Sequence, residues 1–199
     1  RDFLSFSNIN FIRTGTNGVV ATTATSTDIK FCNCCFRCGG AGGSGNEIIL
    51  TVGFGVAANW VIDRCIFFKG VGGATNAINI TLTTGSGSDY DSNIVIKNCL
   101  FFGNSATSVI VTNSGTNTNE GGGVVMMNCT SIAGTAFISS GTRISLTFPS
   151  IVKNCFIICG STNGINSGEL GAVIEDYNLI LAQTPRVNTL IGKGSSSLG

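Results

Sequence analysis

The chain has 199 residues, of which 43% are apolar and 11% are charged, and its formal net charge is +1. The apolar content is sufficient for the core of a single domain, and the low charge excludes the basic surface that attracts nucleic acid or an anionic membrane. No apolar run approaches the ~20 residues that a membrane-spanning helix requires. We therefore expect neither nucleic-acid binding nor insertion into a membrane.

Short strands and tight turns are the elements that the composition favours. The chain contains 28 Gly and only 2 Pro, and runs rich in Gly, Ser, Thr and Asn separate short apolar segments of alternating pattern. We expect one domain over residues 1–190, followed by a Gly/Ser-rich tail or linker over residues 191–199.

An internal repeat with the pattern Asn-Cys-x-Phe extends along the chain. Its copies lie at residues 33–36, 64–67, 98–101, 128–131 and 154–157, and degenerate copies flank them at residues 8–11 and 176–179. The positions taken as equivalent are Ile9, Cys34, Cys65, Cys99, Cys129, Cys155 and Tyr177, so the interval ranges from 22 residues (155 to 177) to 34 residues (65 to 99). Three short strands joined by turns need roughly 20 residues or more. The repeat therefore predicts a solenoid of about seven coils.

Each copy of the motif predicts a corner between two strands. Ile94 and Ile96 alternate toward one face, Asn98 interrupts the alternation, and Cys99 and Phe101 resume on the same interior face. Asn is one of the few residues other than Gly that tolerate the left-handed backbone of such a corner. We expect a structural ladder of stacked amides at Asn8, Asn33, Asn98, Asn128 and Asn154, with Arg64 and Asp176 as exceptions.

A further strand of each coil is predicted between successive motifs. These strands lie at residues 47–52, 77–83, 108–112 and, more weakly, 134–138.

The cysteines fall mainly at one position of the repeat. We expect five of them to stack on successive parallel strands about 4.8 Å apart and to fill the interior as free thiols. These are Cys34, Cys65, Cys99, Cys129 and Cys155.

The segment 32–38 carries a second cysteine signal, because Cys35 and Cys38 form a CxxC pair. Zinc or an iron–sulfur cluster needs converging thiolates, but strand geometry directs Cys32 and Cys35 outward and Cys34 inward. A metal site at Cys35 and Cys38 is therefore the weaker alternative. A local disulfide between them is a further alternative if the protein is extracellular.

An acidic patch is the best candidate for chemistry. The chain has no His, which removes the Ser/His/Asp and Cys/His nucleophilic systems. Asp91 and Glu120 are expected on adjacent coils with Asp89 nearby, where they would bind Ca²⁺ through oxygen ligands or act as a carboxylate pair in glycoside hydrolysis. The favoured interpretation is that these are solvated charges at loop tips.

The Asn ladder and the stacked interior residues resemble those of the pectate-lyase-like right-handed parallel β-helix superfamily. The resemblance covers nearly the whole chain, and it implies an all-β fold made of one single-stranded right-handed parallel β-helix. The superfamily contains pectin-degrading enzymes, phage tailspikes and adhesins, so the resemblance indicates a fold and leaves the function open.

Our favoured functional hypothesis is a non-enzymatic structural or binding domain. It would belong to a virion, as a tail spike, fibre or decoration protein, or to a microbial surface assembly, and would contact glycans or partner subunits. Open strand edges at both ends of a solenoid favour a homo-oligomer or a larger assembly, and free thiols favour synthesis in a reducing cytoplasm. No cofactor is expected, with Ca²⁺ at the acidic patch as the exception. The alternative is a polysaccharide lyase or glycoside hydrolase that uses loop carboxylates.

Overall fold

The computed structural model describes residues 3–13, 20–22, 28–38, 48–52, 58–69, 76–83, 90–103, 107–114, 121–140, 148–159, 163–167, 173–187 and 189–191. Strands, bends and irregular positions occur in this part of the chain, and helices do not. Within these ranges no helix has the length and apolar character needed to cross a membrane.

Three parallel sheets, which we name A, B and C, make up the fold. Sheet A consists of β1 (Leu4–Ser7), β4 (Ile29–Cys32), β7 (Trp60–Asp63), β10 (Tyr90–Lys97), β13 (Gly121–Met127), β16 (Ser150–Lys153), β19 (Val173–Asp176) and β22 (Leu190–Ile191). Sheet B consists of β2 (Asn10–Arg13), β5 (Cys35–Cys38), β8 (Ile66–Lys69), β11 (Leu100–Gly103), β14 (Thr130–Ala133), β17 (Phe156–Cys159) and β20 (Leu179–Leu181). Sheet C consists of β3 (Val20–Thr22), β6 (Ile48–Val52), β9 (Asn76–Thr83), β12 (Thr107–Ser114), β15 (Thr135–Ser140), β18 (Asn163–Ser167) and β21 (Thr184–Val187).

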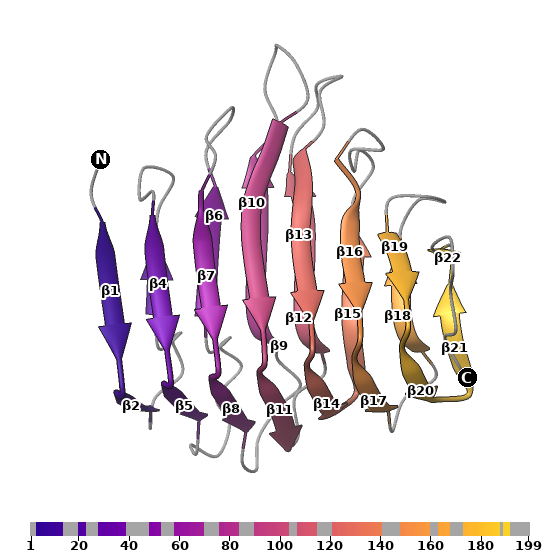
Figure 1. The fold of residues 1–199 in the computed structure, drawn as a ribbon, viewed down its shortest axis with the longest axis horizontal. Coiled ribbons are helices and arrows are strands. Elements are labelled where there is room, and N and C mark those ends of the chain that lie inside the picture. Colours follow the sequence, from indigo (N-terminus) through magenta and orange to yellow (C-terminus); the bar gives the residue numbers. More distant parts are fainter. Residues whose placement is uncertain are drawn as a thin grey trace.

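Consecutive strands enter the three sheets in turn, so three strands complete one round of a solenoid. Every strand pairs in parallel with the equivalent strand of the neighbouring round, as β7 does with β10 and β8 with β11. Figure 1 shows the rounds side by side along the long axis, with the first and last strands at opposite ends. The predicted all-β architecture of stacked parallel strands is confirmed.

The corner between sheets A and B has the left-handed backbone that the repeat predicted. The first corner residue has φ of 54° at Asn33, 56° at Asn98, 52° at Asn128 and 53° at Asn154, and Asn8 and Arg64 share this conformation. Backbone bonds join one corner to the next, as from Asn98 N to the Met127 carbonyl oxygen at 3.1 Å.

Between the corner amides the bonding is weaker than the ladder prediction supposed. Asn128 Nδ2 reaches Asn98 Oδ1 only at 3.5 Å, whereas Asn98 Nδ2 donates to Asp63 Oδ1 at 2.8 Å. At this pair of corners the backbone bond from Asn98 N, at 3.1 Å, is shorter than the bond between the two amides.

The predicted equivalence is wrong by one residue in the last repeat. Tyr177, and not Asp176, has the positive φ of the corner, at 52°. Asp176 pairs with Lys153 at the end of its strand, so Asn178 takes the interior position that cysteine holds in earlier rounds. The error arose because this copy lacks both the Asn and the Cys that mark the others.

A second left-handed corner, which the sequence analysis missed, lies at the beginning of the sheet A strands. Asp28 and Asn59 directly precede β4 and β7, whereas Asn93 and Gly123 lie within β10 and β13, and each of the four precedes an inward residue. Their φ values are 63°, 48°, 50° and 78°. Asn93 Nδ2 donates to Asn59 Oδ1 at 2.6 Å, so two neighbouring rounds are linked through these side chains.

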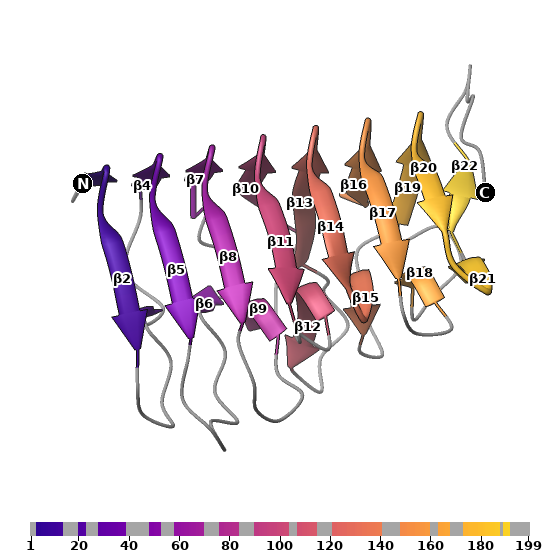
Figure 2. The ribbon, with the colours of Figure 1, turned by 90° about the horizontal axis from the view of Figure 1, so that it is seen from below.

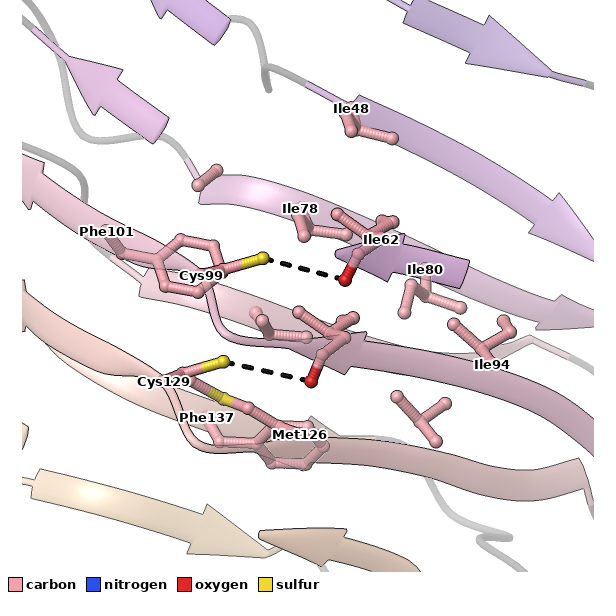
Figure 3. Close-up of a cluster of buried hydrophobic side chains, with 14 of the residues drawn as sticks. Ile48, Ile62, Ile78, Ile80, Ile94, Cys99, Phe101, Met126, Cys129 and Phe137 are labelled. Atoms are coloured by element: carbon pink, nitrogen blue, oxygen red, sulfur yellow. Dashed lines mark hydrogen bonds between the residues drawn. The ribbon is translucent and has the colours of Figure 1, made fainter. Parts of the chain in front are cut away.

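The interior is filled by rows of identical or similar side chains, because parallel register places equivalent residues one above another. The rings of Phe11, Phe36, Phe67 and Phe101 stack with 4.8 Å between successive centroids. Figure 3 shows how Cys99 and Cys129 lie beside isoleucines and aromatic rings within this core. The distance between neighbouring strands thus equals the distance at which the rings stack.

The last complete round closes the core with polar groups. These are Glu175 on β19, Asn178 at the corner and Arg186 on β21, which follow Val152, Cys155 and Ile165 in the same rows. Glu175 is fully buried, and it accepts bonds from Arg186 Nε at 2.6 Å and Asn178 Nδ2 at 3.0 Å. Asn178 Nδ2 also donates to the Val152 carbonyl oxygen at 2.9 Å. A mutually bonded polar cluster therefore ends the apolar interior.

We expect Arg186→Met to lower the free energy of unfolding by about 3–5 kcal/mol, because it leaves the buried Glu175 carboxylate without its cation. Urea unfolding measures the change. The matched control is Glu175→Leu/Arg186→Met, which removes both charges and should recover most of the loss. An unchanged free energy in Arg186→Met would show that the ion pair does not stabilise this end of the core.

Candidate functional site

The repeated cysteines form one interior row of thiols. Cys34, Cys65, Cys99, Cys129 and Cys155 are at most 3% exposed, and all are free. Each thiol lies close to the carbonyl oxygen two residues earlier, at 3.1 Å for Cys99 and 3.2 Å for Cys129 and Cys155. Cys99 and Cys129 also point toward carbonyl groups of the neighbouring round (Figure 3). The row is packed and hydrogen-bonded, which is a structural role.

Three thiols of the row, those of Cys99, Cys129 and Cys155, have a raised pKa and are kept protonated. The adjacent Cys129 thiol and then burial raise the pKa of the Cys155 thiol. For Cys99, the Cys129 thiol lowers the pKa, but the Cys65 thiol together with burial raises it further, so the net direction is upward. Cys129 behaves in the same way between Cys155 and Cys99. A thiol held in its neutral form is a poor nucleophile and a poor metal ligand.

We expect stability to fall at alkaline pH. The folded chain holds these protons more tightly than the unfolded chain, in which a thiol has a pKa of about 8.5. The stabilisation of the folded state by the protonated thiols is therefore fully present below that pH and is lost as the pH rises above it. Above that pH, the free energy of unfolding falls by about 1.4 kcal/mol per pH unit for each thiol. Urea unfolding between about pH 7 and pH 10 measures it. Cys155→Ala should show a shallower slope; an equal slope would contradict the assignment.

The cysteine-rich segment does not gather its thiols at one point. Cys34 points into the core, Cys35 is half-buried on the outer face of sheet B, and the Cys38 side chain lies outside the described residues. Cys32 is 9% exposed, and Arg64 Nη2 lies 3.1 Å from its Sγ. In the described part of the chain, no group of three or more His, Cys, Asp or Glu side chains could hold a metal ion.

Arg64 connects two rounds at this corner. Besides its contact with Cys32, its Nε lies 3.4 Å from Asp63 Oδ2, and the hydrogen bond to Cys32, followed by the nearby Asp63 carboxylate, raises the pKa of the guanidinium. The expectation that Cys32 points outward agrees with its strand position, but Arg64 covers it. In the sequence, the sign of this contact is that Arg replaces the corner Asn in one repeat alone.

Only one member of the proposed acidic patch can be placed. Asp89 and Glu120 lie outside the described residues, and Asp91 is exposed on β10 opposite Gly122. Asp91 Oδ1 accepts the Asn93 backbone N–H at 2.8 Å, at an irregularity in the strand pairing. A Cβ added at Gly123, where φ is 78°, would collide with this carboxylate in its present position, so glycine there allows the close approach of Asp91. The Asp91 carboxylate therefore supports the second corner.

Asp91→Ala removes the acceptor for the Asn93 N–H and is expected to lower the free energy of unfolding by about 1 kcal/mol. Thermal or urea unfolding measures this change, and Asp91→Asn, which keeps an acceptor oxygen, is the matched control. Were a polysaccharide-cleaving activity established for the chain and then abolished by both substitutions, the structural interpretation of Asp91 would be wrong.

The outer face of sheet B is the feature that the sequence reading missed. Its two outward rows are mostly apolar and run across all seven strands in register. The first row is Asn10, Cys35, Ile66, Leu100, Thr130, Phe156 and Leu179, and the second row is Ile12, Arg37, Phe68, Phe102, Ile132, Ile158 and Leu181. We call these two rows the sheet B face. In Figure 2 no other described strand lies over it.

Several side chains of the sheet B face are substantially exposed, among them Ile12 at 63%, Ile132 at 44% and Leu181 at 52%. Arg37 carries the one charge in the two rows, and its guanidinium lies over the Phe68 ring at 5.6 Å. The available signal was the uninterrupted apolar run in several motif copies, such as Ile66-Phe67-Phe68 and Leu179-Ile180-Leu181, because such runs indicate a strand that is apolar on both faces.

Comparison of this chain with protein-family models, with curated proteins and with solved structures finds no match in any of the three.

Proposed function

We propose that this protein is a non-enzymatic structural or binding domain that works as part of a larger assembly. Its fold would be a right-handed parallel β-helix of about seven coils over residues 1–190, with the architecture of the pectate-lyase-like superfamily. Residues 191–199 would serve as a tail or linker. The assembly would be a virion, with the domain in a tail spike, fibre or decoration protein, or a microbial cell surface.

The observation that carries this proposal is the sheet B face. Soluble monomers rarely expose a contiguous apolar patch of more than a few hundred Å², and larger patches mark interaction sites. Seven strands spaced by about 4.8 Å and four residues of about 3.3 Å each give a flat area of roughly 440 Å². An apolar surface of that extent supports contact with partner subunits.

The side chains that could take part in catalysis are bonded within the fold, and this supports the same proposal. The motif thiols are bonded to backbone carbonyl oxygens, Glu175 is paired with Arg186, and Asp91 accepts a bond from its own strand. Each of these groups holds a part of the solenoid together. The proposal accordingly requires no cofactor.

The chemistry of the cysteines bears on where the protein is made and where it acts. A row of free thiols is compatible with synthesis in a reducing cytoplasm, and burial protects it from later oxidation at a virion or cell surface.

Glycans are the further class of ligand that we propose, since exposed aromatic rings such as Phe156 pack well against the apolar faces of sugars. Cleavage of a polysaccharide by loop carboxylates is the alternative, and substitution of Asp91 tests it.

Light scattering of the purified chain tests the assembly role. We expect a species larger than the monomer to form as the concentration rises to about 100 µM, a range that includes micromolar dissociation constants. A subunit that assembles through an apolar face should respond weakly to added salt, which distinguishes it from association by charge. A strictly monomeric chain over this range would contradict the proposal.

A further inference from the structure

The sheet B face has an open hollow in one half and exposed apolar side chains without such a hollow in the other. The hollow has a volume of about 330 Å³, is open to solvent, and is lined by Cys35, Arg37, Ile66, Phe68 and Phe102 on β5, β8 and β11. On the other side of β11, Ile132 on β14 and Phe156 on β17 are 44% and 38% exposed. The hollow lies in one half of the face, and exposed apolar side chains that could enter it lie in the other half.

We propose that a second copy of this chain docks on the sheet B face, with Ile132 and Phe156 of each copy entering the hollow of the other. This inference rests on the proposed assembly function and specifies its partner. A two-fold axis parallel to the strands and above β11 relates the copies, so β5 lies opposite β17 and β8 lies opposite β14. Such a contact is isologous, because the same residues meet twice.

The size of the face agrees with this occupant. Two faces of roughly 440 Å² flat area, whose side chains stand out from the sheet, would together bury on the order of 1,000 Å² of accessible surface, the lower limit expected for a specific interface. Sheets pack face to face at about 10 Å, a distance that interdigitating side chains fill. The contact is therefore sufficient for a weak dimer, or for one contact of a larger assembly.

Charge favours a second copy and fixes its orientation. The sheet B face offers Arg37 alone as a charged group, and its guanidinium already lies over the Phe68 ring, so the face provides little to attract a strongly charged partner. The proposed axis places Arg37 opposite Ile158 of the other copy and one row away from Phe156, whose ring the long Arg37 side chain can reach as a second partner for the cation. An axis along the stack of rounds would instead place β5 opposite β5 and bring two Arg37 side chains close together.

Two complementary substitutions test the reciprocal contact. Ile132→Lys puts a cation on the protruding half, and Ile66→Asp, at a residue 42% exposed, puts an anion in the hollow. Each variant alone should weaken self-association by at least about 100-fold, as expected for charge placed at the centre of an apolar interface. In an equimolar mixture, the introduced lysine of one variant and the introduced aspartate of the other lie on facing strands, one row apart and within reach of the long lysine side chain, and the second of the two contacts is native. Heterodimers should then form with an affinity within about 10-fold of the parent dimer.

Analytical ultracentrifugation of each variant and of the mixture measures association, and circular dichroism verifies the strands. Phe3→Asp is the matched control, because Phe3 is 68% exposed and lies before β1, away from sheet B; it should associate like the parent. Self-association of both variants at parental affinity would refute docking through sheet B but leave the assembly role standing. A mixture that stays dissociated would refute the reciprocal arrangement, and a monomeric parent would refute both proposals.

Discussion

The parallel register between successive rounds is the constraint on which the rest of this structure depends. Left-handed residues at Asn33, Asn98 and Asn128 turn the chain from one sheet to the next, and backbone bonds between these corners hold neighbouring rounds in line. Once the register is fixed, every side chain lies about 4.8 Å from its equivalent in the next round. Rows of identical chemistry, inside and outside, follow from that one spacing.

The same constraint explains both why the interior suits cysteine and why its last round is polar. A small, polarisable side chain fits beside the corner and bonds a carbonyl group nearby, as Cys99 and Cys155 do. Where no further complete round follows, an apolar row would end facing water, and Glu175 with Arg186 provides a bonded polar layer instead. The two ends of the core consequently differ, since Phe6 and Phe11 continue the aromatic rows toward the amino-terminal end.

The residues on the outside of the solenoid are not constrained in the way that the interior residues are. Register does not require apolar residues outside, yet Ile66, Phe68 and Phe102 are aligned on the outer face of sheet B as regularly as the core is aligned within. Burying such a face is favourable by about 25 cal/mol per Å² of apolar surface, before the entropy of association is subtracted. A surface of this kind is the reason that assembly, and not chemistry, is the proposed function.

The sequence by itself determined the repeat, the parallel all-β architecture, the corner positions and the interior cysteine row, because these depend on local conformation and on an alternation visible along the chain. It failed at Tyr177, where neither Asn nor Cys marks the corner, and it missed the second corner at Asn59 and Asn93. Only the tertiary structure decided the contacts between residues on different strands: that Arg64 contacts Cys32 of the neighbouring round, and that Glu175 on β19 pairs with Arg186 on β21. Loop lengths and register, and no local signal, bring these residues together. The bond from Asn93 N–H to Asp91 Oδ1 is local, but the sequence pattern did not indicate this role for the Asp91 carboxylate.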